Sequence, residues 1–213
     1  NNICGKEKAA YYGVTYSLAM ALNIVITSIY TSVQPWYFKK IKEKDYVSIR
    51  NNTNILLMFP FLLAILISLF APEILSIMAP DTYKSALYIF PAVAASIYFN
   101  NLFLYFSNFE SYYERPIYFS IATSVGAIVN IILNWLLIPI FGFVVAGYTT
   151  LFCYMLFALM HYIFMKKVCK DHNINVEVFD KKFILTLSFL IVIISLGIIL
   201  LYYNKIIRYC IIV

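Results

Sequence analysis

The sequence predicts an all-α, polytopic membrane helical bundle. Three observations lead to this fold class: 63% of the 213 residues are apolar, only 12% are charged, and the mean hydropathy is +0.83. Soluble domains are nearer half apolar and a quarter charged. A soluble domain with a large buried core would also need helices with polar outer faces, and the apolar segments here have none.

Six runs without a charged residue account for this apolar excess. Each is close to the roughly 20 residues with which a helix crosses the hydrocarbon core. The runs lie at residues 14–34, 53–72, 86–107, 117–138, 144–165 and 183–203. Membrane strands are short and alternate polar with apolar residues, so runs that are apolar on every face favour helices. We expect a single transmembrane lobe over 1–213, and a longer parent protein because the chain starts with Asn1 rather than Met.

The fourth and fifth runs are joined by an unusually apolar turn. In "LLIPIFGFVVAG" (136–147), Pro139 is expected to end one helix and Gly142 to permit the turn. The next helix is expected to begin near Val144. Gly147 would then let a neighbouring helix approach closely. The sequence therefore predicts a tight helical hairpin at the membrane surface.

Lysine and arginine are distributed unevenly among the loops. Eleven lie in or beside the loops 35–52, 108–116 and 166–182, and five lie on the opposite side. The eleven are Lys39, Lys40, Lys42, Lys44, Arg50, Arg115, Lys166, Lys167, Lys170, Lys181 and Lys182, and the five are Lys6, Lys8, Lys84, Lys205 and Arg208. The positive-inside rule places the lysine-rich loops in the cytoplasm. The net charge of +6 is thus a topology signal and does not indicate a nucleic-acid partner.

Polar residues recur on one face of two of the expected spans. The first carries Asn23, Thr27 and Gln34, in register with Tyr16 and Tyr30. The fourth carries Ser120, Thr123, Asn130 and Asn134, and the third has Asn100 and Asn101. Polar groups within a bilayer must face protein or water. Two interpretations remain open: hydrogen bonds between helices, or the wall of a hydrophilic cavity.

His161 is the only His, Asp, Glu, Lys or Arg within the six runs. It lies near Lys166 and the expected interface, where water or headgroups could satisfy its hydrogen bonds. The alternative is a proton relay, for which this half offers no other titratable candidate. The neighbouring segment "ESYYER" (110–115) is expected to be an ordinary solvated loop.

Catalytic and metal-binding motifs are absent from the sequence. There is no pair of carboxylates, Ser-His-Asp set, HExxH, P-loop or glycine-rich fingerprint, and Glu73 and Asp81 in one outer loop are weak evidence for glycosyl transfer. Cys4, Cys153, Cys169 and Cys210 lack the spacing of a metal or disulfide site. We therefore expect neither an enzyme nor a metal or other cofactor.

Three stretches resemble the C-terminal half of the oligosaccharide flippases, in the polysaccharide exporter branch of the multidrug/oligosaccharidyl-lipid/polysaccharide superfamily. The first, 9–40, has a Tyr-Tyr entry and Pro35 near its cytoplasmic end. The second, 70–94, has a proline, an acid-Thr-Tyr segment and an alanine-rich helix. The third, 126–154, resembles the family's Asn-x-x-x-Asn, Pro-x-Phe-Gly run, although Val145 stands where the family usually has glycine.

The resemblance implies one lobe of a two-lobed transporter in the bacterial cytoplasmic (inner) membrane. Such a transporter exports undecaprenyl-diphosphate-linked oligosaccharide repeat units by alternating access for surface polysaccharide biosynthesis. The implied partners are this lipid-linked substrate, membrane lipid, the N-terminal lobe and polysaccharide assembly proteins. The alternatives are a multidrug/cation antiporter of the same superfamily, which would be expected to carry an intramembrane acid, and a non-transporting membrane subunit.

Overall fold

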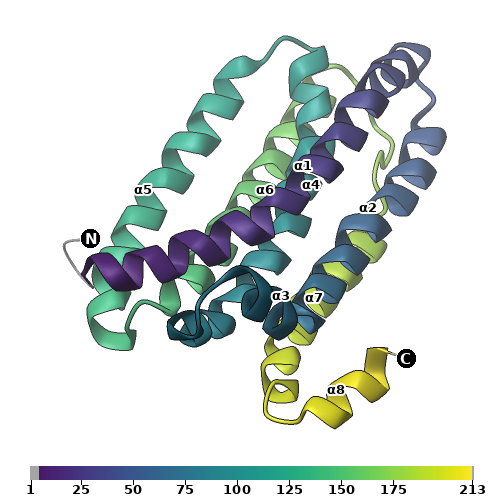
Figure 1. Ribbon diagram of the computed structural model, residues 1–213. Coiled ribbons are helices and arrows are strands. Elements are labelled where there is room, and N and C mark those ends of the chain that lie inside the picture. Colours follow the sequence, from purple (N-terminus) through teal and green to yellow (C-terminus); the bar gives the residue numbers. More distant parts are fainter. Residues whose placement is uncertain (1–4, 213) are drawn as a thin grey trace.

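The computed structural model describes residues 5–212, and it confirms the all-α fold class (Figure 1). The elements within this range are α1 (Lys6–Glu43), α2 (Tyr46–Leu69), α3 (Ala71–Met78), a 3-10 helix η1 (Asp81–Ile89), α4 (Phe90–Tyr112), α5 (Pro116–Phe141), α6 (Val145–Asp171), α7 (Lys181–Leu201) and α8 (Lys205–Ile212). Five helices are long and apolar enough to cross a membrane, and α1 makes a sixth if its bent halves form one span. The protein is therefore a multi-pass membrane protein.

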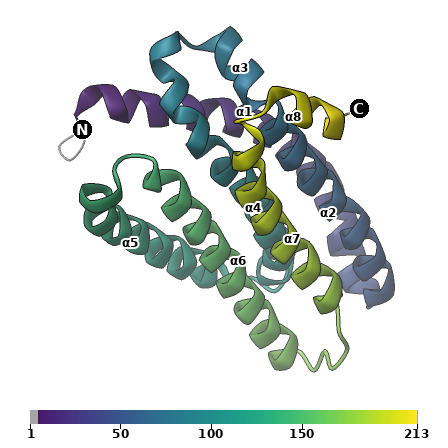
Figure 2. The ribbon, with the colours of Figure 1, turned by 90° about the horizontal axis from the view of Figure 1, so that it is seen from below.

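Helix α4 is the centre of the bundle. It packs against α1, α2, α6 and α7, and nearly every side chain from Phe90 to Glu110 is buried. Alanines at 92, 94 and 95 keep this helix narrow, so its neighbours approach closely. Viewed from one end, α5 and α6 lie on one side of α4, and α2 and α7 lie on the other (Figure 2). Almost every side chain of α4 therefore contacts one of the neighbouring helices.

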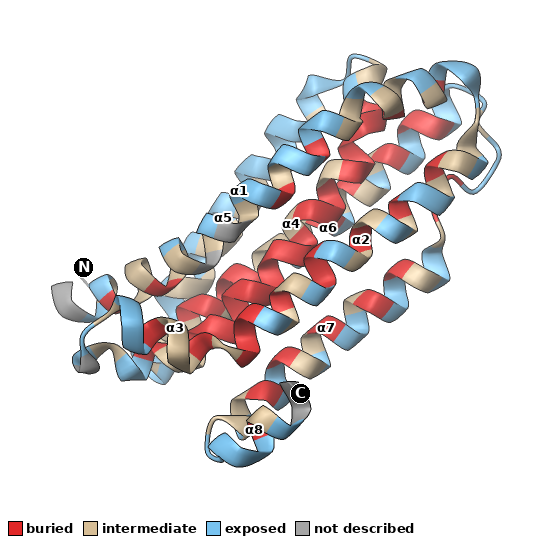
Figure 3. Ribbon diagram, turned by 45° about the vertical axis from the view of Figure 1, so that its right-hand side comes forward, coloured by how far each residue is buried: buried red, intermediate tan, exposed pale blue. Residues whose placement is uncertain are grey.

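The outer helices expose apolar side chains to the bilayer. Only Ala122 of α5 is buried, whereas Ile131, Trp135 and Ile140 are largely exposed. Helix α7 likewise exposes Phe189 and buries Ile191 against the bundle. Figure 3 shows this arrangement as buried residues along α4 and exposed residues along the outer faces. An exposed apolar belt of this kind is what lipid tails would cover.

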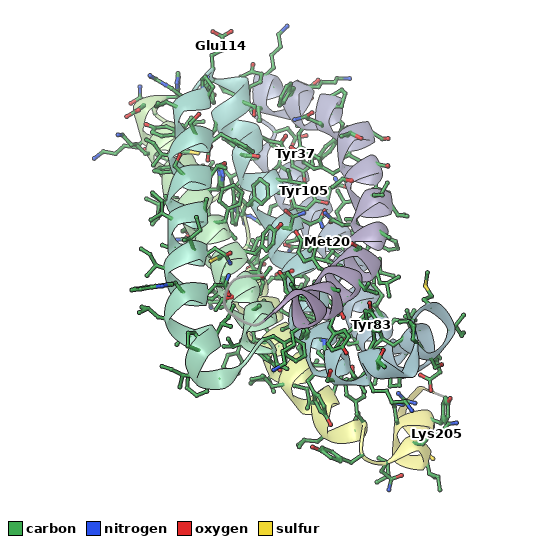
Figure 4. The ribbon with its side chains drawn as sticks, turned by 60° about the vertical axis from the view of Figure 1, so that its left-hand side comes forward. Met20, Tyr37, Tyr83, Tyr105, Glu114 and Lys205 are labelled. Carbon is green, nitrogen blue, oxygen red and sulfur yellow. The ribbon has the colours of Figure 1, made fainter. Side chains whose placement is uncertain are left out.

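Aromatic packing joins the long helix α1 to α4. The rings of Tyr37 and Tyr105 lie side by side between these helices (Figure 4). Their centroids are 5.6 Å apart. The hydroxyl of Tyr37 also lies 2.6 Å from that of Thr53 on α2. Helix α1 bends by 40° between Lys8–Leu18 and Asn23–Glu43. These contacts fix its second half against the core while the first half crosses toward α6.

The loops 35–52, 108–116 and 166–182 meet at one end of the bundle, which we call the lysine-rich end. The ring of Tyr113, after α4, stacks at 3.8 Å on that of His172, after α6. Arg50 at the start of α2 hydrogen-bonds to the carbonyl of Glu177 in the loop between α6 and α7. Glu114 marks this end in Figure 4 and Lys205 the opposite one. The charge asymmetry in the sequence is thus an asymmetry between the two ends of the fold.

The expected outer loop after the second span is helical. Helix α2 ends at Leu69, and the segment 71–89 forms α3 and η1 before α4 begins. Pro72 lies in the first turn of α3, where a missing N–H is harmless. The second span was expected to end at residue 72 and ends at Leu69. Hydropathy alone does not reveal that a new helix begins inside an apolar run.

Candidate functional site

A pocket with a mainly apolar lining that carries hydroxyl and amide groups opens between α1, α5 and α6, roughly midway along α5. We call it the polar pocket for those groups. Its volume is about 370 Å³. The polar and aromatic residues that line it are Tyr12, Tyr16, Thr123, Asn130, Thr150, Cys153, Tyr154 and Phe157. None of its lining residues is charged. A pocket of this composition offers hydroxyl and amide groups beside aromatic rings, within the part of the chain that crosses the membrane.

Helix α1 supplies an aromatic wall of this polar pocket. The rings of Tyr12 and Tyr16 stack with centroids 5.7 Å apart. The hydroxyl of Tyr12 lies 2.8 Å from that of Thr150, and the hydroxyl of Tyr16 lies 3.5 Å from that of Tyr154. Both partners are on α6. The bend in α1 thus places two tyrosines where they close the pocket against α6.

Helix α5 supplies another wall of the pocket, with Asn130 in it and Asn134 bonded behind it. The Asn134 amide donates to Oδ1 of Asn130 at 2.9 Å, and Thr149 Oγ1 donates to Oδ1 of Asn134 at 2.7 Å. The Asn130 amide lies 3.6 Å from Sγ of Cys153. Asn130 lines the pocket, whereas Asn134 lies behind it in the α5–α6 hydrogen-bond network. On this face of α5, Asn134 makes hydrogen bonds between helices, and Asn130 also lines a cavity.

The polar face of α1 is directed elsewhere, toward α4. Asn101 donates to Oδ1 of Asn23 at 3.0 Å. Gln34 donates to the Tyr30 hydroxyl at 3.2 Å and to Oδ1 of Asn108 at 3.4 Å. Thr27 donates to the carbonyl of Asn23 in its own helix at 2.9 Å. The structure therefore does not bring Asn23, Thr27 and Gln34 together with Asn130 and Asn134.

A buried acid-base pair lies at the lysine-rich end of α4 and α6. Nδ1 of His161 is 2.9 Å from both carboxylate oxygens of Glu110. Their side chains are 0% and 3% exposed. Among the described residues, Nε2 of His161 has no hydrogen-bond partner although it is buried. Among the acid–base contacts recorded for the described residues, this one is the most deeply buried.

The surroundings of both groups differ from those expected from the sequence. Glu110, expected in a solvated loop, is buried because α4 continues to Tyr112. His161, expected to meet water or headgroups, is enclosed and bonded to Glu110. No helical pattern marks Glu110: Asn101 and Asn108 lie seven residues apart on the face of α4 that meets α1, whereas Glu110, two residues after Asn108, faces α6.

The turn between α5 and α6 depends on its glycines. Gly142 has φ 77° and ψ −177°, a region that side chains disfavour. A Cβ on Gly147 would lie 2.7 Å from Cγ2 of Ile89 and 3.2 Å from its carbonyl oxygen. Pro139 lies inside α5, which ends only at Phe141, so the expectation that Pro139 ends the helix is wrong. Its ring removes one N–H, and a membrane helix can continue past such a gap.

At the opposite end, Glu73 of α3 holds the last helix. It accepts from Arg208 of α8 and, at 2.8 Å, from the hydroxyl of Tyr209.

No group of three or more His, Cys, Asp or Glu that could hold a metal occurs among the described residues. Cys153, Cys169 and Cys210 are free thiols, and Cys4 lies outside the described range.

The fold and the pocket define a multi-pass helical membrane protein with an uncharged polar cavity between its helices. No family model, curated protein or solved structure matches the chain. The resemblance to oligosaccharide flippases therefore rests on the three sequence stretches alone, and the function is argued from the pocket.

Proposed function

We propose that this chain is one lobe of a transporter that exports undecaprenyl-diphosphate-linked oligosaccharide repeat units by alternating access. The observation that carries the proposal is the polar pocket, with two stacked tyrosines on α1 and Asn130 on α5. We place the protein in the bacterial cytoplasmic membrane with its lysine-rich end inside. The partners of this lobe are then the lipid-linked substrate, the N-terminal lobe and the polysaccharide assembly proteins.

The pocket suits a sugar chemically. Hydroxyl and amide groups both donate and accept hydrogen bonds, as sugar hydroxyls do. Aromatic rings give an apolar face with a polar handle, on which the C–H face of a sugar ring can rest. Because no lining residue is charged, the diphosphate must be held elsewhere, and we assign it to the other lobe. On this view the present lobe binds and selects the sugar, and the other lobe binds the diphosphate of the lipid carrier.

The exposed face of α1 gives further support to a two-lobed transporter. It carries Ser28, Thr31 and Ser32, all exposed, beside the exposed ring of Pro35. Each hydroxyl donates to a carbonyl of α1 itself and keeps an oxygen that can accept from a partner, which protein or water offers and lipid tails do not. We therefore assign this face of α1 to the contact with the second lobe.

Export of surface polysaccharide tests this function. In a strain that depends on the full-length protein for export, Asn130→Leu should reduce surface polysaccharide while an expression blot shows a normal protein level. Tyr16→Phe, which removes a pocket hydroxyl, should act in the same direction. Tyr30→Phe is the matched control, because its hydroxyl bonds to Asn108 away from the pocket. Export that falls only in proportion to protein level in all three variants would refute the pocket's role.

A second candidate is a multidrug/cation antiporter of the same superfamily. The sequence argued against it because no acid lies within the uncharged runs, but Glu110 is an acid buried inside α4. Efflux of a cationic dye from cells that carry the protein would distinguish the two. Dye efflux that is lost in Glu110→Gln, together with unchanged surface polysaccharide, would favour the antiporter. If the protein supports neither polysaccharide export nor dye efflux, the result would favour a non-transporting membrane subunit.

A further inference from the structure

We propose that Glu110 and His161 form a proton-binding site, and that the proton bound there drives the conformational cycle. The second part of this proposal rests on the proposed transport function, and the first part does not. The geometry that carries it is a buried imidazole with one nitrogen on a buried carboxylate and the other nitrogen without a partner.

The binding step follows from the two nitrogens. In the proton-free state Nδ1–H of a neutral imidazole donates to the Glu110 carboxylate, so the pair carries one negative charge. Nε2 is then an unprotonated acceptor. A hydronium ion transfers a proton to Nε2: one O–H bond breaks, one N–H bond forms, and a water molecule is left. The pair becomes an imidazolium and a carboxylate with no net charge.

Proton binding changes the balance of forces inside the bundle. A single uncompensated charge is costly in a low-dielectric interior, whereas an adjacent pair of opposite charges costs much less. The two protonation states of this site therefore favour different surroundings for Glu110: water in the proton-free state, and enclosure in the proton-bound state. Packing of α4 against α6 around the pair is thus sensitive to the proton.

Aromatic rings around the imidazole are suited to a cation. The ring centroids of Phe103, Phe157 and Phe119 lie 5.1, 4.7 and 5.5 Å from that of His161. Phe164 lies at 6.3 Å. Rings at roughly 6 Å or less can stabilise a positive charge through their quadrupoles. A residue that only filled space would need neither the carboxylate nor this set of rings.

One cavity reaches the pair directly, at Glu110, and the polar pocket comes as near as Phe157, whose ring contacts His161. Glu110 lines a cavity of about 530 Å³ at the lysine-rich end, which we call the mouth cavity. It is lined by Glu110, Ser111, Glu114, Arg115, Pro116, Phe119 and Ser120. Phe157 lines the polar pocket and contacts the imidazole on that side. Phe119 and Phe157, 6.0 Å apart, thus separate the two cavities beside His161. A site between two cavities is placed to exchange its proton with either in turn.

The other ionisable groups near the pair are few. Glu114 and Arg115 line the mouth cavity with Glu110. Tyr118 of α5 stacks on Phe164, and Lys167 of α6 lies over the Tyr118 ring at 5.5 Å. In the described parts of α1, α2 and α7, no ionisable side chain hydrogen-bonds to the pair. The charge of the site is therefore set mainly by its own two members.

Nuclear magnetic resonance can test proton binding without any transported substrate. The full-length protein is prepared with ¹³C-labelled histidine in lipid nanodiscs, and the ring signals are followed over about pH 5 to 9, the range in which histidine changes charge. In this chain the only other histidine is His172, which is exposed and serves as the internal reference. Signals are assigned with His161→Gln and His172→Gln.

The expected result is a His161 signal that moves with pH, and whose dependence on pH changes in Glu110→Gln while that of His172 does not. Glu110→Gln keeps an oxygen that accepts from Nδ1–H, so the packing survives while the negative charge beside the imidazole is removed. A His161 signal that stays constant while His172 titrates in the same sample would overturn the proposal, because the pair would then be a fixed structural contact.

The coupling claim has its own readout. With surface polysaccharide as the probe, Glu110→Gln at normal protein level should lose the export that depends on the proton gradient. If His161 binds a proton but export in Glu110→Gln stays as in the wild type, the coupling claim fails and the binding site stands. If the wild-type protein exports no polysaccharide, the proposed function fails, and the resonance result is unaffected.

Discussion

Nδ1 of His161 lies 2.9 Å from each carboxylate oxygen of Glu110, across 51 residues of sequence and between two packed helices. Because both side chains are enclosed, each is the main compensation for the other's charge or polarity. Removing one member leaves the other without a partner in a low-dielectric site. Stability should therefore respond more strongly to a single substitution than to a matched double one.

The first prediction concerns this asymmetry. His161→Leu should lower the free energy of unfolding by about 3 kcal/mol or more, since it strands a buried carboxylate. Glu110→Gln should cost less, because the amide oxygen still accepts from Nδ1–H. The double variant Glu110→Met, His161→Leu should recover most of the loss. Unfolding in detergent, followed by circular dichroism, measures all three. A double variant no more stable than His161→Leu would contradict the prediction.

The second prediction concerns the contact of Gly147 with Ile89. A Cβ at residue 147 would lie 2.7 Å from one side-chain atom of Ile89 and 3.2 Å from its carbonyl oxygen, so α6 must move away from η1. Overpacking of this kind costs about 1–3 kcal/mol, and Gly147→Ala should lower the unfolding temperature. Gly197→Ala is the matched control, because nothing lies within 4 Å of its Cβ. Equal behaviour of the two variants would rule out a close approach at Gly147.

The third prediction concerns the turn at Gly142. Its backbone has φ 77°, and a residue with a Cβ is strained there whatever space surrounds it. Gly142→Val should lower thermal stability and membrane yield, at a cost of about 1–3 kcal/mol for the strained conformation. Gly142→Ala should show a smaller loss of the same sign, because alanine lacks the β-branch. Wild-type stability in Gly142→Val would show that the turn relaxes to another conformation.

Local features of the fold could be predicted from the sequence, and pairings across long separations could not. Uncharged runs locate helices, and Gly142 marks a turn, because both depend on neighbouring residues. The partner of Asn23 is Asn101, 78 positions away, and no single-helix pattern identifies it. Hence the polar face of α1 was predictable, while its direction toward α4 was not.

The Glu110–His161 pair was missed for a related reason. A span predicted from hydropathy ends at its last uncharged residue. Glu110 is buried inside α4 beyond that point, because His161 pairs with it. The end of α4 at Tyr112 is fixed by packing against α2, α6 and α7, which hydropathy does not report. Intramembrane charges with a partner are therefore where boundary predictions fail and where function is concentrated.

The fourth prediction concerns the orientation in the membrane. Lys42, at the lysine-rich end, should be cytoplasmic, and Thr82, in η1, should face outward. Single cysteines at these positions, in a background whose own cysteines are replaced by serine, are treated in intact cells with a membrane-impermeant thiol reagent. Lys42→Cys should react only after lysis and Thr82→Cys before it. The reverse pattern would invert the topology.

The last prediction concerns Asp45, which begins α2 at the lysine-rich end. Its carboxylate accepts from Nζ of Lys40 at 2.8 Å and from the hydroxyl and backbone N–H of Ser48 at 2.7 and 3.1 Å. These hydrogen bonds, that from Lys40 foremost, lower the pKa of Asp45 to about 2. The same carboxyl in an unfolded chain titrates near 4.

The sign of the pH effect follows from this difference. Since the folded pKa is the lower one, the unfolded chain binds protons first as the medium is acidified. The stability that Asp45 contributes is fully present above about pH 4 and is lost as pH falls toward about 2. Lys40→Met should raise the pKa of Asp45 and make this acid-induced loss smaller. Lys39→Met is the matched control, because its exposed ammonium approaches Glu43 at 3.9 Å and has no recorded contact with Asp45. The measurement is the unfolding temperature of each variant at neutral and at acid pH. If both variants show the same pH dependence as the wild type, Lys40 does not set the charge state of Asp45.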